Sequence, residues 1–336
     1  MTIGAALVLS ACGGGSGGAG GVSSTPAPTT PITSLPNSLT PISAANSGSA
    51  ASNAYAASAS ISDASSAVSA ALTGVSIDGQ SVSIISPALD IVTRAYKKNA
   101  PKLLTGVAIS DSCSGGGTVS TTGTVQSEDV ASNGDTLTFT SNNCVENGAT
   151  INGAFTIVLS GIVGTAFADG AWGATLGTQL AGFSVASGST TVAVSGDMKI
   201  AISHASLNSG TLAISGKSLQ ASQSTAGVKV ATRTLADYSA TAVIQGNTLT
   251  ATANYALSGG TASLGLIAYS VKNTKPFVSA NGGTPTSGSL IVNGASSSVT
   301  VTVLDAAYVR LDYSAKGDGV ITQSTTVSWP SFKANF

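Results

Sequence analysis

The sequence predicts a mainly β protein, built as one large antiparallel sheet with one or two N-terminal helices packed on it. Three observations support this fold class: a composition rich in Gly, Ser, Thr, Ala and Val, long runs of alternating apolar and polar residues, and turn signals between those runs. Such residues favour strands and turns over long surface helices. The pattern leaves open whether the sheet forms a closed barrel, a sandwich, a half-barrel or an open roll.

Alternation of apolar and polar residues is clearest over residues 192–203, 248–257 and 299–303. Side chains of a strand point alternately to its two faces, so each segment predicts a strand with one buried face. In the first segment the apolar positions are Val192, Val194, Met198, Ile200 and Ile202, and the polar ones are Ser195, Asp197, Lys199 and Ser203. Turn signals that separate or kink the strands are Gly196-Asp197, Gln245–Asn247, Ser258–Gly260 and Asn281–Gly283. Together they predict antiparallel hairpins.

Two helices are expected before the strands. The first covers about residues 51–75, where Ile61, Val68, Leu72 and Val75 recur at helical spacing. The second covers about residues 86–99, with Ser86 as N-cap and Pro87 at the first helical position. Both helices are expected to dock on the sheet.

Charge excludes one class of function. Only 8% of the residues are charged and the net charge is −1, which leaves no electrostatic footprint for nucleic acid. Four basic residues cluster, but they fall in the last turn of the second expected helix, where cations complement the helix dipole. They are Arg94, Lys97, Lys98 and Lys102.

The first residues have the layout of a secretory signal, with a short apolar segment from Ile3 to Leu9 followed by small residues and a cysteine. Residues 9–12 resemble the bacterial lipobox. The resemblance implies a signal peptide over residues 1–11, cleavage before Cys12 and diacylglycerol on the Cys12 sulfur. Gly13 stands where inner-membrane lipoproteins usually have Asp, which implies the outer membrane. Met1 and Thr2 supply no positive charge, so we expect the true start to lie upstream.

Residues 12–50 are expected to be a flexible tether, since their Gly runs and Thr/Pro repeats bury too little apolar surface to fold. A single domain over residues 51–336 is expected to follow.

The chain has three cysteines. Lipidation of Cys12 leaves Cys113 and Cys144, which flank a predicted hairpin and are expected to form a disulfide in an oxidising compartment.

Several motifs resemble a pattern found in uncharacterised proteobacterial outer-membrane lipoproteins, and they cover about half of the domain. The resemblance implies the same location and architecture, and it implies no activity. The motifs are Cys113–Thr118, Thr136–Phe139, Asn142–Cys144, Pro285–Ala295, Val299–Leu304, Val309–Asp312, Gly317–Gly319 and Val327–Trp329.

Residues that could carry chemistry are few. Asp312 and Asp318 with Gly319 are a weak candidate for a Ca²⁺ loop, and a plain turn is the favoured interpretation. The only histidine, His204, has no nucleophile on a strand-to-helix elbow to serve, so we expect a structural role. Adjacent acids such as Glu128 and Asp129 point apart in an extended chain and are expected to lie in a solvated turn.

These observations predict a lipid-anchored envelope protein that is not an enzyme and needs no cofactor or metal. It would act as a structural or binding module whose protein or small-molecule partner the sequence does not identify. Two alternatives remain: a carrier that encloses lipid or another apolar molecule in a curled-sheet cavity, and a hydrolase of envelope polymers. The membrane itself is the one partner that the sequence implies, through the lipid on Cys12.

Overall fold

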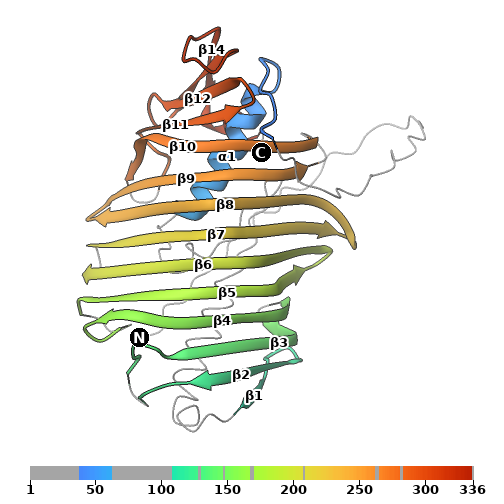
Figure 1. Ribbon diagram of the computed structural model, residues 1–336, viewed down its shortest axis with the longest axis vertical. Coiled ribbons are helices and arrows are strands. Elements are labelled where there is room, and N and C mark those ends of the chain that lie inside the picture. The colour runs from blue at the N-terminus through green and yellow to red at the C-terminus, as the bar shows by residue number, and fades with distance from the viewer. Residues whose placement is uncertain are drawn as a thin grey trace, which may run out of the picture. The chain divides into compact units, whose positions relative to one another are not determined.

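A computed structural model describes residues 38–62, 108–127, 130–146, 148–166, 170–206, 209–261, 265–280 and 283–334. It contains one sheet of 14 strands in which every strand pairs antiparallel with the next along the chain. The sheet is not closed into a barrel, and Figure 1 shows the strands stacked in sequence order from β1 to β14. The expected fold class is therefore confirmed, and the sheet is an open meander.

The strands differ greatly in length: those in the middle of the sheet have 14 to 18 residues, and those at its edges have four and six. The elements are α1 (Ser47–Ser62), β1 (Ile109–Ser112), β2 (Thr118–Thr124), β3 (Thr136–Glu146), β4 (Ala149–Val163), β5 (Trp172–Ser187), β6 (Thr190–Ser206), β7 (Ser209–Thr225), β8 (Val228–Gln245), β9 (Thr248–Thr261), β10 (Gly265–Ala280), β11 (Ser287–Gly294), β12 (Ser297–Val303), β13 (Tyr308–Ser314), β14 (Gln323–Ser328) and α3 (Trp329–Lys333).

Short hairpins connect several of the long strands. The turn between β7 and β8 is Ala226-Gly227, and both residues have positive φ angles, as the favoured two-residue hairpin turns require. Gly246, which also has a positive φ, lies in the turn between β8 and β9, so that predicted turn is confirmed. Ser258–Gly260 is not a turn, because it lies inside β9.

The predicted alternation places apolar side chains on one face of the sheet. Val192, Val194, Met198 and Ile200 on β6 are buried, as are Val299, Val301 and Val303 on β12. We call this side the inner face, because α1 packs against it, and the opposite side the outer face. One row of cross-strand neighbours on the outer face is small and uncharged. It runs Ser160, Thr175, Ala201, Ala213, Thr241 and Thr252 across β4 to β9.

A line of β-bulges crosses the sheet from β3 to β10. The paired register shifts at neighbouring positions in every strand pair from β3 to β10 except β7–β8, whose register continues unchanged across the line. A bulge bends its strand and can change which residues face inward: β8 buries Arg233 and Leu235 before its bulge and Tyr238 and Ala240 after it. The irregular positions are Asn142-Asn143, Gly153, Ala181–Phe183, Asp197-Met198, Gly216–Ser218, Asp237-Tyr238 and Asn273–Pro276.

The domain begins earlier than the sequence predicts. Thr40 donates its backbone N–H to the Ala268 carbonyl (2.8 Å), and its own carbonyl accepts the Ala295 N–H (3.1 Å). The chain before α1 is therefore fixed to β10 and to the turn after β11, and the expectation that the tether extends to residue 50 is wrong. Small uncharged residues without apolar patterning suggested a tether, but the backbone groups of this segment are satisfied by the sheet.

Helix α1 starts at Ser47, before the expected residue 51. Ser43 and Asn46 precede it and accept each other's backbone N–H groups through their side chains, a reciprocal arrangement like a capping box. Every residue from Ala50 to Ser58 is buried, which small Ala and Ser side chains allow. Residues 63–75 of the first expected helix and the second expected helix, 86–99, lie outside the described residues.

An aromatic cluster joins α1 to the C-terminal end. The Tyr55 ring on α1 lies 5.3 Å from Phe277 of β10, 5.1 Å from Trp329 and 5.6 Å from Phe332, measured between ring centroids. Trp329 and Phe332 belong to α3, which Ser328 caps by accepting the Ser331 N–H. Neither α1 nor α3 has the length and apolarity that crossing a membrane requires.

Candidate functional site

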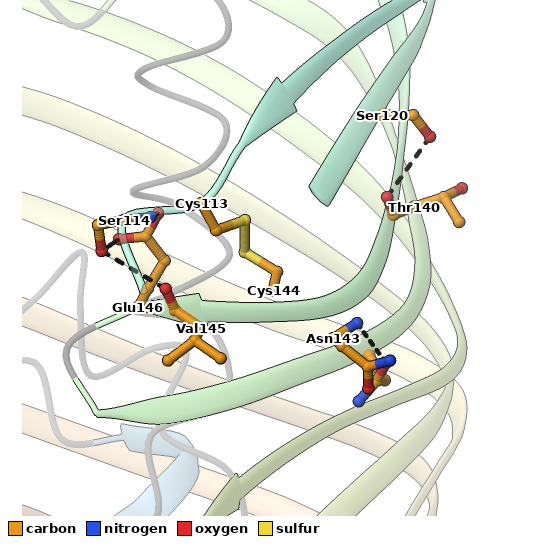
Figure 2. The surroundings of a disulfide bond; sticks show 9 residues. Cys113, Ser114, Ser120, Thr140, Asn143, Cys144, Val145 and Glu146 are labelled. Atoms are coloured by element: carbon orange, nitrogen blue, oxygen red, sulfur yellow. Dashed lines mark hydrogen bonds between the residues drawn. A yellow bond between two sulfur atoms is a disulfide. The ribbon is translucent and has the colours of Figure 1, made fainter. Parts of the chain in front are cut away.

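Cys113 and Cys144 are joined as expected, with an S–S distance of 2.04 Å and a Cα–Cα distance of 5.4 Å. Cys113 lies in the turn between β1 and β2, and Cys144 lies on β3 just after the Asn142-Asn143 bulge. Figure 2 shows β3 bending between Thr140 and Cys144, which brings the end of the strand under the β1–β2 turn. The disulfide therefore fixes the edge of the sheet to the bent part of β3.

Glu146 lies beside this disulfide (Figure 2). Its carboxylate accepts the Ser114 hydroxyl at 2.8 Å and the Ser114 N–H at 3.2 Å. Among the described residues, Cys113, Cys144 and Glu146 are the group that comes close enough together for a metal. Disulfide sulfurs have no thiolate to offer, since the thiolate is the ligand form of cysteine. The group is therefore best understood as a structural staple.

Four charged residues of β6, β7 and β8 meet at the line of bulges: Asp197, Lys199, Lys217 and Asp237. They line an open depression of about 380 Å³. Its lining residues are Asp197, Lys199, Ser215, Gly216, Lys217, Asp237 and Tyr238. Sequence reasoning placed Asp197 and Lys199 on the polar face and marked a turn or kink at Gly196-Asp197. It missed this cluster, because the residues that gather there depend on which strands pair and on where their registers shift.

Asp197 is held by the backbone of the neighbouring strand. Its two carboxylate oxygens accept the Lys217 N–H at 2.8 Å and the Ser218 N–H at 2.9 Å. Burial raises the pKa of the Asp197 carboxyl, but these two hydrogen bonds outweigh that effect, and the net pKa is lowered. Asp197 thus satisfies backbone donors that the bulge removes from the regular ladder.

Lys217 and Tyr238, two further ionisable residues that line the depression, are also fixed. Lys217 Nζ donates to Asp237 Oδ1 at 3.0 Å in an exposed ion pair, and this hydrogen bond, together with the charge of Asp237, raises the pKa of Lys217. Tyr238 donates its hydroxyl to the backbone carbonyl of Asp197 at 2.5 Å. Burial raises the pKa of the Tyr238 phenol, and the negative charge of Asp197 adds to that rise.

These shifts limit what the depression can do chemically. A general acid or base works best when its pKa lies near the operating pH. The shifts of Asp197, Lys217 and Tyr238 all lead away from neutrality. The depression can therefore form hydrogen bonds and ion pairs with a polar molecule, but these three groups are not poised to transfer protons.

His204 lies at the end of β6, opposite Trp172 of β5. Its Nδ1 is 3.0 Å from the Gly170 carbonyl oxygen, and its ring stacks on Trp172 with centroids 5.8 Å apart. Asp197 is on the same strand but seven residues away. The contacts of His204 are those of a side chain that holds the end of the β5–β6 hairpin in place.

The two acids of the weak Ca²⁺ candidate have separate protein partners. Asp312 accepts Arg310 Nε at 2.8 Å and the Ser324 hydroxyl at 2.7 Å. Asp318 accepts the Ser314 hydroxyl at 3.2 Å and the Val320 N–H at 3.0 Å, as in a turn that an Asp side chain stabilises. Cys12, Glu128 and Asp129 lie outside the described residues.

A buried arginine is a further feature that the sequence did not reveal. Arg233 on β8 is only 1% exposed, and its guanidinium donates to the Asn53 side-chain oxygen on α1. Next to it, Tyr255 on β9 donates its hydroxyl to the Ala54 carbonyl. These bonds attach α1 to the inner face by direction-specific contacts, beyond apolar packing alone.

Comparisons with protein-family models, curated proteins and solved structures found no match. The function must therefore be argued from the chain itself.

Replacing both disulfide cysteines by alanine should lower the free energy of unfolding by about 3 to 4 kcal/mol, because the unfolded chain regains the entropy that the closed loop removes. Urea unfolding of the wild type and of the double variant measures the difference. Reductant should weaken the wild type by a similar amount and leave the double variant unchanged. Free thiols at both positions in the purified wild-type protein would contradict the disulfide.

Replacing Asp197 by Asn should lower the free energy of unfolding at neutral pH by about 2 kcal/mol or less, since one charge-assisted acceptor is lost in an open site. The lowered pKa means that the ionised Asp197 stabilises the fold above its ordinary pKa of 3.8, and that this stabilisation is lost as the pH falls through the folded-state pKa. Urea unfolding should show the two proteins converging in acid. Asp237→Asn is the matched control, because its exposed ion pair should contribute less; an equal loss in both variants would contradict the assignment.

Proposed function

We propose that this protein is a lipid-anchored protein of the bacterial outer membrane that acts as a non-enzymatic structural or binding module. The observation that carries the non-enzymatic part is the hydrogen bonding in the charged depression. Asp197 accepts the Lys217 and Ser218 N–H groups, and Tyr238 donates to the Asp197 carbonyl. Their hydrogen bonds hold bulged backbone in place. This is the pattern expected of structural side chains, and the pKa shifts of Asp197, Lys217 and Tyr238, which lead away from neutrality, agree with it.

The outer face supports a role as a surface for contact. Its cross-strand row from Ser160 to Thr252 is six strands wide and carries only hydroxyl and methyl groups. Such a surface suits many weak hydrogen bonds to a neutral polymer or a neighbouring protein. The charged depression between β6, β7 and β8 would add ion pairs to that contact.

The anchor rests on the lipobox at residues 9–12 and is supported by the disulfide, which suits an exported protein. Its expected test is partitioning of the full chain into detergent, together with the mass of its N-terminal peptide. The wild type should carry the mass of the acyl chains on Cys12 and enter the detergent phase, because several chains anchor far more firmly than one. Cys12→Ser should carry no lipid and stay in the aqueous phase. A wild type without added mass would overturn the anchor.

The non-enzymatic part is tested by a separate screen of the purified full chain against esterase, peptidase and glycosidase substrates. We expect no turnover that depends on the chain. Two variants accompany the wild type. His204→Ala removes the histidine at the end of β6, and Asp197→Asn removes the carboxylate of the depression that accepts two backbone N–H groups. Turnover by the wild type that either substitution abolishes would refute the non-enzymatic assignment.

A further inference from the structure

The open sheet has two edges, and they are built differently. β1 has four residues and carries a charge, Asp111, in its middle. Short and charged edge strands resist pairing with other chains. β14 has six residues, Gln323–Ser328, without charge, proline or glycine. It therefore lacks the usual features that protect an edge strand.

β14 is also open to solvent. All six of its residues pair with β13, and Gln323 to Thr326 are exposed. Within the described ranges no strand pairs with its other side, and Figure 1 shows β14 at the end of the stack. α3 does not cover this edge, because Trp329 and Phe332 turn back onto Tyr55 of α1.

The register shows which backbone groups of β14 point outward. Trp329 donates its backbone N–H to the Ala307 carbonyl at 3.0 Å, so 307 and 329 form a hydrogen-bonded pair. Hydrogen-bonded and non-hydrogen-bonded pairs alternate along an antiparallel ladder. The groups that point away from β13 are therefore the N–H and C=O of Ser324 and Thr326 and the N–H of Ser328, whose carbonyl begins α3.

We propose that this edge pairs with the β14 strand of a second copy of the chain, antiparallel and about a two-fold axis at Thr326. The axis places Thr326 opposite Thr326, so that the two residues exchange both backbone hydrogen bonds, with Ser324 opposite Ser328 on each side. A two-fold axis perpendicular to the sheet keeps both inner faces on the same side and makes the interface isologous.

A second copy fits this edge better than a charged or apolar peptide would. The strand is neutral throughout, so self-pairing sets no like charges opposite each other. Thr–Thr and Thr–Val cross-strand pairs are favourable, and this register creates one Thr326–Thr326 pair and two Thr325–Val327 pairs. The two exposed aliphatic residues just before the strand, Val320 and Ile321, would lie toward the partner's chain where it enters α3.

The test is the oligomeric state of the full chain in detergent, measured by light scattering across a range of concentrations. We expect the wild type to be dimeric. Thr326→Lys and Thr326→Glu should each weaken the dimer at least about tenfold, since like charges would stand directly opposite, and an equimolar mixture of the two should restore it. Ser110→Lys adds the same charge to β1, the other edge, and should leave the dimer unchanged.

A second measurement separates pairing from misfolding. Thr326→Pro removes an outward N–H and no bond to β13, and proline is tolerated at such edge positions, so its melting temperature should stay near that of the wild type while the dimer is lost. Slow hydrogen exchange at the Thr326 amide should accompany the wild-type dimer alone. A monomeric wild type would overturn the proposal, and so would a dimer that survives Thr326→Lys and Thr326→Pro. Protection of the Thr326 amide from hydrogen exchange by a different protein, instead of by a second copy, would also overturn it.

Discussion

Strands of 15 to 18 residues, such as β4 to β8, cannot bend sharply while every residue keeps its regular partner. The chain meets this constraint with bulges that adjoin one another from β3 to β10. Each bulge lets its strand bend and resets which residues face inward. Because neighbouring strands bend at the same line, the ladder continues on both sides of it.

The charged depression is one consequence of the line. Gly196 and Gly216 allow the backbones of β6 and β7 to approach closely there: an added Cβ at Gly196 would lie 2.0 Å from the Ser218 carbonyl oxygen, and one at Gly216 would lie 2.5 Å from the Asp197 carbonyl oxygen. The bulge leaves backbone N–H groups without strand partners, and the Asp197 carboxylate takes two of them. The charged cluster has the residue types of a functional site, but the position of Asp197 in it is explained by the backbone N–H groups to which it bonds.

The disulfide and α1 stabilise the sheet toward the two ends of its strand order. Cys144 directly follows the first bulge, so its bond to Cys113 holds β3 in its bent form. At the other end, Arg233 and Tyr255 bond to α1, and Tyr55 of α1 packs among the aromatic rings of β10 and α3. A sheet without closure needs such attachments, because its edge strands have only one neighbour each.

Much of the fold could be predicted from the sequence, because alternation and hairpin turns are local signals. The strands with Val192, Tyr255 and Val299 were predicted in this way. The pairing of Cys113 with Cys144 was predicted from the count of three cysteines and from the hairpin that the two residues flank. The prediction of a turn at Ser258–Gly260 was wrong. Gly259 is required by the close approach of β8, since an added Cβ would lie 2.0 Å from the Thr232 carbonyl oxygen. In a sequence, a glycine needed for packing looks the same as one needed for a turn. The depression could not be predicted, since it depends on which strands lie side by side and on where their registers shift.

The central claim is that the bulge line requires its particular backbone, and two glycines of positive φ test it most directly. Gly196 lies on the line, whereas Gly246 lies in an open turn where an added Cβ would meet nothing within 4 Å. The free energy of unfolding should fall by about 3 kcal/mol for Gly196→Ala, through clash and strain together, and by only about 1 kcal/mol for Gly246→Ala, through strain alone. Equal losses in the two variants would contradict the account.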